Sequence, residues 1–130
     1  MSIDDNFLLD WGARVGIQAR LERLAKTQVE GLISSLEYIS DKRACLLLTA
    51  AFAHRQAERL GKGARTARLL NTALSEIHKR GGGREEARRL LGIAKWVFET
   101  VENKRLPWDV SSDTSKLTFT EYLEKILRRI

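Results

Sequence analysis

Residues 44–53 read ACLLLTAAFA, and this apolar run decides the fold. Its large side chains leave little room for a polar face, so we expect a helix whose first half lies at the centre of the core. Ser40 or Asp41 offers a cap for this helix, which we expect to end near Leu60. Cys45 lies inside the run and is the only cysteine, which excludes an intramolecular disulfide and indicates a buried, unreactive thiol.

On either side of this run, apolar residues recur at the three- and four-residue spacing of a helix. This periodicity predicts helices over about residues 5–26, 27–39, 64–80 and 84–103, and a last helix from Thr118. Thr27–Glu30 and Thr118–Glu121 both fit the capping-box pattern. No stretch alternates as a strand does, so the chain is predicted to be all-α, a compact bundle of five to six helices in a single domain over residues 1–130.

Glycines mark several helix ends and one helix interior. Gly61 or Gly63 can supply the left-handed residue that ends the third helix, and residues 81–83, all glycine, end the fourth. Gly12 and Gly16 lie inside the first helix, where they either weaken it or let another backbone approach closely. The last helix ends in cations that suit the negative end of a helix dipole, namely Lys125, Arg128 and Arg129.

The composition is that of a globular protein, with 43% hydrophobic and 31% charged residues. The longest apolar runs are too short to cross a membrane. The N-terminal residues are acidic and do not resemble a secretory signal, so we expect a cytoplasmic protein.

Positive charge is concentrated in the middle of the chain. Residues 42–95 hold 13 Lys or Arg against 4 Asp or Glu, a balance of +9, while the remaining residues hold 10 basic against 13 acidic, a balance of −3. Such asymmetry indicates an anionic partner, and the polyanion that most often binds a basic segment of this kind is a nucleic acid.

The helix expected to begin at residue 64 is the strongest candidate site. Acidic residues normally occupy the first turn of a helix, but here Arg65 lies in that turn and no acid does. Free backbone N–H groups, glycines and cations together would bind phosphate. The candidate nucleic-acid-binding residues are the cations of this junction and a second group after the three glycines: Arg55, Arg59, Lys62, Arg65, Arg68, Arg84 and Arg88. A solvated face is the alternative for the first group, and a structural role is equally open for the second, because Glu85 and Glu86 lie nearby.

No motif indicates catalysis or a cofactor. The run over residues 61–66 lacks the spacing and the preceding strand of a nucleotide-binding P-loop. His54 and His78 are the only histidines, and neither has a companion at metal-ligand spacing. No arrangement suits a serine or cysteine nucleophile. We therefore expect a protein that is not an enzyme and that holds no metal or cofactor.

The tryptophans offer a weaker signal. Trp11 and Trp96 fall within amphipathic helices, so we expect them in the core rather than stacked on bases. Trp108 follows the only proline, in a loop expected over residues 104–116, and we expect it to pack back on the bundle unless a partner covers it.

The central stretch carries a family resemblance. An apolar helix that ends in FAHRQAER, residues 52–59, is followed by a helix with Arg65 and Arg68 and then by the aromatic run at residues 96–98. In this pattern, and in its size, helical content and basic surface, the chain resembles the small, all-helical, non-catalytic subunits of CRISPR effector ribonucleoproteins, which serve antiviral defence.

The resemblance implies a sequence-independent contact with nucleic acid. In that family, cations contact the duplex of guide RNA and target strand, or the displaced strand, by charge and shape without reading bases. Several copies stack head to tail, so the resemblance also implies self-association into a short filament and contacts with the other protein subunits. No family motif assigns individual residues, so the candidate positions come from the charge argument alone.

Two other functions stay open. The third and fourth helices would make a helix-turn-helix if Arg65, Thr66 and Arg68 faced a major groove, as in a transcription regulator. Alternatively, the cations would meet acidic protein surfaces in a helical adaptor that binds no nucleic acid.

Overall fold

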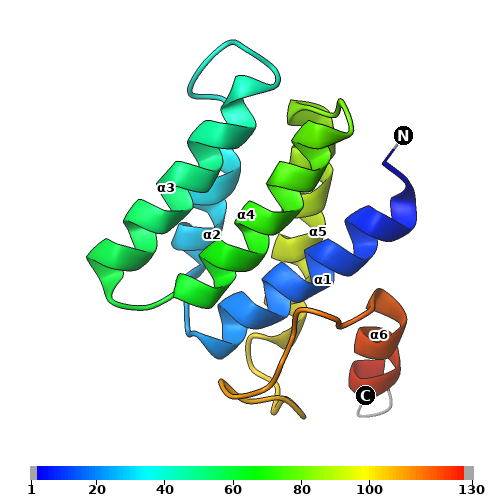
Figure 1. Ribbon diagram of the computed structural model, residues 1–130. Helices are drawn as coiled ribbons and strands as arrows, with labels where there is room; N and C mark the ends of the chain where they lie inside the picture. The colour runs from blue at the N-terminus through cyan, green and yellow to red at the C-terminus, as the bar shows by residue number, and fades with distance from the viewer. Residues whose placement is uncertain (1–2, 128–130) are drawn as a thin grey trace.

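The computed structural model describes residues 3–127, which form six helices and no strand (Figure 1). The helices are α1 Asp5–Leu21, α2 Lys26–Ser35, α3 Ala44–Leu60, α4 Ala64–Lys79, α5 Arg84–Val101 and α6 Phe119–Leu127. Figure 1 shows α3, α4 and α1 in front of α2 and α5, with α6 beside α1. The predicted all-α bundle of five to six helices is confirmed. Arg128 and Arg129 lie outside the described residues.

The tightest contact in the bundle joins α1 to α5. A Cβ atom added at Gly16 would lie 2.5 Å from the carbonyl oxygen of Ala94, and one added at Gly12 would lie 2.5 Å from a methyl group of Ile93. The two glycines therefore let the helices approach more closely than any side chain would allow. Of the two roles that the sequence left open for them, close approach is the one observed.

The main core cluster joins residues of α1 to α5, and the apolar run of residues 44–53 contributes only part of its side chains to it. Cys45 and Leu46 are fully buried, which confirms the buried thiol, but Leu47 is 57% exposed. Leu48 and Phe52 are only partly buried. The expectation that the first half of this helix lies at the centre of the core holds for Cys45 and Leu46 but not for Leu47, which lies on a side of α3 that the other described residues leave open.

Most helix ends follow the local signals. Asp41 accepts hydrogen bonds from the backbone N–H groups of Arg43 and Ala44, at 2.9 and 2.7 Å, and caps the start of α3. Gly61 is left-handed, with φ of 69°, and ends that helix. The box at residues 118–121 is confirmed, since the backbone N–H of Glu121 donates to the Thr118 hydroxyl at 3.0 Å.

Two boundaries at the first connection differ from the prediction. The helix α1 ends at Leu21 rather than near residue 26, and Arg23 takes a left-handed conformation with φ of 61°. The capping box expected at residues 27–30 does not form, because these residues already lie inside α2. Instead, the side chain of Gln28 accepts from the backbone N–H of Ala25 at 2.7 Å, so α2 begins earlier.

The tryptophans separate into exposed and packed positions. Trp96 is 70% exposed, so its expected place in the core was wrong. Trp11 packs on the main core cluster, and Trp108 packs back on the cluster around α6, as expected for that loop residue. Within residues 3–127, no helix combines the length and the apolar character needed to cross a membrane.

Gly16→Ala should destabilise the protein by about 1–3 kcal/mol, because the new methyl group would press on the Ala94 carbonyl. Gly92→Ala is the matched control: Gly92 lies inside α5 as Gly16 lies inside α1, but a Cβ there meets nothing within 4 Å. It should leave stability unchanged or raise it by up to about 1 kcal/mol. Urea denaturation followed by circular dichroism measures both. Equal effects of the two substitutions would contradict the close contact.

Candidate nucleic-acid interface

The start of α4 is already occupied by an anion from the protein itself. Glu22, just past the end of α1, accepts from the backbone N–H of Thr66 at 2.7 Å, from its hydroxyl at 2.6 Å and from the backbone N–H of Arg65 at 3.3 Å. This carboxylate supplies the negative charge that a helix start favours and that the first turn of α4 lacks. The predicted phosphate site on free backbone N–H groups was therefore wrong.

Arg84 and Arg88 are engaged by other parts of the protein, although Arg88 stays exposed. Arg84 donates to the carbonyl oxygens of Leu36 at 2.9 Å and Ile39 at 2.5 Å, and so satisfies the backbone that follows α2. Arg88 forms an ion pair with Glu37 and a second one with Glu85 at 3.0 Å. Arg84 is thus bound to backbone carbonyls, and the charge of Arg88 is already paired with carboxylates.

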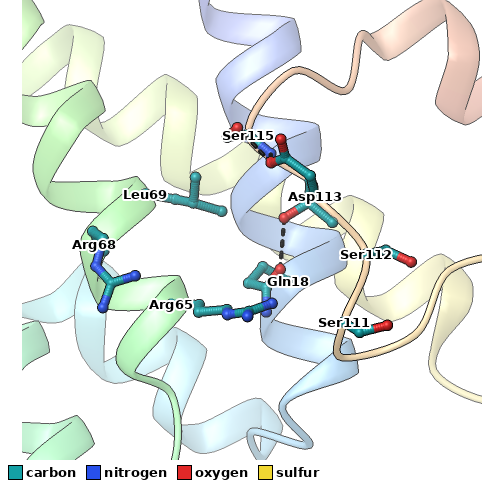
Figure 2. A pocket seen from close by; sticks show the side chains of 9 residues that line it. Gln18, Arg65, Arg68, Leu69, Ser111, Ser112, Asp113 and Ser115 are labelled. Atoms are coloured by element: carbon teal, nitrogen blue, oxygen red, sulfur yellow. Dashed lines mark hydrogen bonds between the residues drawn. The ribbon is translucent and has the colours of Figure 1, made fainter.

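Arg65 and Arg68 lie together at a cavity of about 330 Å³ (Figure 2). The cavity is bounded by α4, by Gln18 of α1 and by the loop over residues 111–115. Arg65 reaches this loop and donates to the carbonyl oxygen of Val110. Arg68 is exposed, and no carboxylate within residues 3–127 forms an ion pair with it. These two cations are the part of the predicted set that shares one site.

The other three predicted residues lie elsewhere. Lys62 donates to the carbonyl oxygen of Arg23 at 2.7 Å and fastens the α3–α4 turn to the end of α1. Arg55 and Arg59 are one turn apart on α3, both exposed, and no carboxylate in the described part of the chain pairs with them. At helical spacing they share a face with Phe52 rather than with the cavity. The seven cations therefore do not form one strip.

Sequence reasoning missed Gln18 and the serine-rich loop of the cavity. Gln18 is 1% exposed, and its Oε1 accepts from the hydroxyl of Thr114 at 2.6 Å. The spacing from Trp11 and Val15 placed it on the apolar stripe of α1, so a polar side chain on a buried face was the available signal. A loop was expected in this part of the chain, but no local sequence signal indicated that it would line the site. It reaches the site only because it passes over α1 (Figure 1).

The loop is ordered by short local hydrogen bonds. Asp109 accepts from the backbone N–H and the hydroxyl of Ser111 at 2.8 and 2.5 Å, and Asp113 does the same with Ser115 at 3.0 and 2.5 Å. Hydrogen bonds from the serine hydroxyls lower the pKa of both carboxyl groups. Both loop carboxylates are therefore ionised at neutral pH, and Asp113 places negative charge opposite Arg65.

Two apolar grooves lie apart from the cavity at Arg65 and Arg68, and the first of them is also bordered by Arg88 and Arg89. One, of about 560 Å³, runs between α1 and α5 and is bordered by Leu8, Ile93 and the exposed Trp96. The other, of about 480 Å³, lies between α2 and α3 beside Phe52 and Tyr38, which is 82% exposed. Exposed aromatic surface of this extent is typical of protein contacts.

Glu22→Ala should cost about 1–2 kcal/mol of stability, since it leaves two N–H groups of α4 unpaired. Added sulfate should then recover more stability in this variant than in the wild type, because the freed helix start binds anions. Glu58→Ala is the control, an exposed acid of α3 in the same basic stretch. Thermal melts with and without sulfate measure the effect. Equal recovery in all three proteins would contradict the role given to Glu22.

Arg88→Ala should raise the pKa of Glu37 toward its ordinary value of 4.5, because the hydrogen bond from Arg88 is the main cause that lowers it. Since the folded value lies below the unfolded one, the pair stabilises the protein above about pH 4.5 and loses that effect as pH falls through the folded pKa. An NMR titration of the Glu37 side chain measures the shift. Arg89→Ala, which breaks a pair with Glu85 alone, should leave the pKa of Glu37 in place.

Comparison with known proteins identifies no relative of this chain. No protein-family model, curated protein or solved structure matches it. Within residues 3–127, no three His, Cys, Asp or Glu side chains gather as metal ligands would. Any functional assignment therefore depends on the arrangement of the side chains described above.

Proposed function

We propose that this protein is a non-catalytic subunit that binds a nucleic-acid backbone without sequence preference, with Arg65 and Arg68 as the central contacts. One observation carries the proposal. Two exposed arginines, one of them without a carboxylate partner in the described chain, lie at the mouth of a polar cavity on a protein with a net charge of +6. Guanidinium groups in such a position suit phosphate, which they bind through paired N–H donors.

The resemblance to CRISPR small subunits supplies the setting. In this proposal, the backbone belongs to a guide RNA, its target or the displaced strand, and other subunits cover the apolar grooves. The groove beside Trp96 and the groove beside Tyr38 lie on different helices. A contact that joins one to the other between copies would be heterologous, as head-to-tail stacking requires.

The geometry does not favour a helix-turn-helix regulator. Figure 1 shows α3 and α4 side by side and running in opposite directions, whereas the two helices of that motif cross at a steep angle. The backbone of Arg65 and Thr66 is also bound to Glu22, which holds the start of α4 against α1. A helical adaptor remains the second candidate, favoured by the exposed aromatic grooves.

Arg68→Ala should reduce the slope of log affinity against log salt by about 0.7–0.9, the contribution of one phosphate contact. Arg88→Ala should leave the slope unchanged, because Glu37 and Glu85 already neutralise that cation. Titrations with single-stranded and double-stranded RNA and DNA over a range of salt concentrations measure both. A slope that is equal in the wild type and in Arg68→Ala would remove this residue from the interface. Absence of binding to all four probes would favour the adaptor.

A further inference from the structure

We propose that the cavity between α1, α4 and the loop over residues 111–115 receives one nucleotide, with its phosphate at Arg65 and Arg68 and its ribose or base at Gln18. The inference rests on the proposed function, because the same arginines hold the phosphate. It goes beyond the proposed function because it assigns a binding pocket. A contact with the nucleic-acid backbone alone would need only an exposed surface.

Gln18 carries the argument because its amide is incompletely satisfied. The side chain is 1% exposed, and its Oε1 accepts from the Thr114 hydroxyl at 2.6 Å. Its Nε2 has no hydrogen-bond partner among the described residues. A buried donor without an acceptor destabilises a protein, so this amide is a good position for an acceptor that comes from outside the chain.

The size of the cavity excludes a small anion as its full occupant. It measures about 330 Å³, whereas one water takes about 30 Å³ in the liquid, so phosphate alone would leave most of the space to solvent. The value lies at the lower end of the range for small-molecule sites. The occupant we propose therefore has two parts. A negatively charged group binds at Arg65 and Arg68, and an uncharged group with hydrogen-bond acceptors fills the rest of the cavity.

Apart from the Asp113 carboxylate, which faces Arg65, the lining matches the two halves of a nucleotide. Arg65 and Arg68 provide cationic donors from one wall, and Leu69 provides an apolar surface beside them (Figure 2). On the opposite wall, the hydroxyls of Ser111 and Ser115 already donate to aspartates of their own loop, so they can only accept from a ligand. Gln18 is then the neutral donor left for an oxygen of the ribose or base.

The nucleotide could arrive free or as one unit of a strand, and the two sources share this chemistry. Uridine 5′-monophosphate and a short single-stranded oligouridine distinguish them. Inorganic phosphate is the third probe, because it carries the charge without the body.

The test is an NMR titration that follows the side-chain amide of Gln18, assigned as the signal lost in Gln18→Met. Either nucleotide probe should shift this signal, while inorganic phosphate should shift only the arginine signals. A shift with the mononucleotide identifies a free nucleotide, and a shift with the oligonucleotide alone identifies a unit of a strand. No shift with either nucleotide probe would overturn the proposal, and this readout uses binding to the wild-type protein.

Affinity measurements give the second arm. Gln18→Met should weaken binding of the nucleotide probe about tenfold, the loss of one buried hydrogen bond. Gln56→Met is the matched control, a buried glutamine whose amide donates to the carbonyl oxygen of Gln28 at 3.3 Å, away from the cavity. It should leave the affinity unchanged, and circular dichroism melts check that both variants fold.

The two proposals fail in different ways. If Arg68→Ala weakens oligonucleotide binding but Gln18→Met does not, the backbone contact stands and the nucleotide pocket is wrong. If neither substitution has an effect, the proposed function fails together with the pocket.

Discussion

The close approach of α1 and α5 is the contact on which the rest of the structure depends. Two glycines on α1 allow it, and α1 in turn positions most of the candidate site. From this one helix come Gln18 at the cavity, Asp10, which accepts from the backbone N–H of Phe119 at 2.8 Å, and Arg14, which donates to the carbonyl oxygen of Leu117 at 2.7 Å. The cavity exists because α1 fixes α4 on one side and the long loop on the other.

How much the sequence revealed depended on how far apart the interacting residues lie in the chain. The number of helices, the Asp41 cap and the box at Thr118 depend on residues a few positions apart, and all were predictable. The exposure of Leu47 and Trp96 was not, because periodicity shows which residues share a face but not whether another helix covers it.

The same limit applies to the candidate site. The charge balance showed where in the chain the basic residues lie. It did not show which of them have hydrogen-bond or ion-pair partners within the protein. Arg84 and Arg88 engage carbonyl groups and Glu37, which come from a segment far away in the chain, while Arg68 has no such partner among the described residues. The cap from Glu22 is also long-range, so a helix start that looked electrostatically unfavourable is in fact complete. Net charge indicates a class of partner, and only the fold shows which cations are free to meet it.

Trp96 gives the protein a built-in optical reporter. Its indole is largely in water, whereas Trp11 and Trp108 pack against the bundle with a cation over each ring. Emission from a hydrated indole lies at longer wavelength than emission from a desolvated one. Covering the α1–α5 groove, which Trp96 borders, would therefore change the fluorescence of the unlabelled protein. The α2–α3 groove is not bordered by a tryptophan, so its occupation would leave this signal largely as it is.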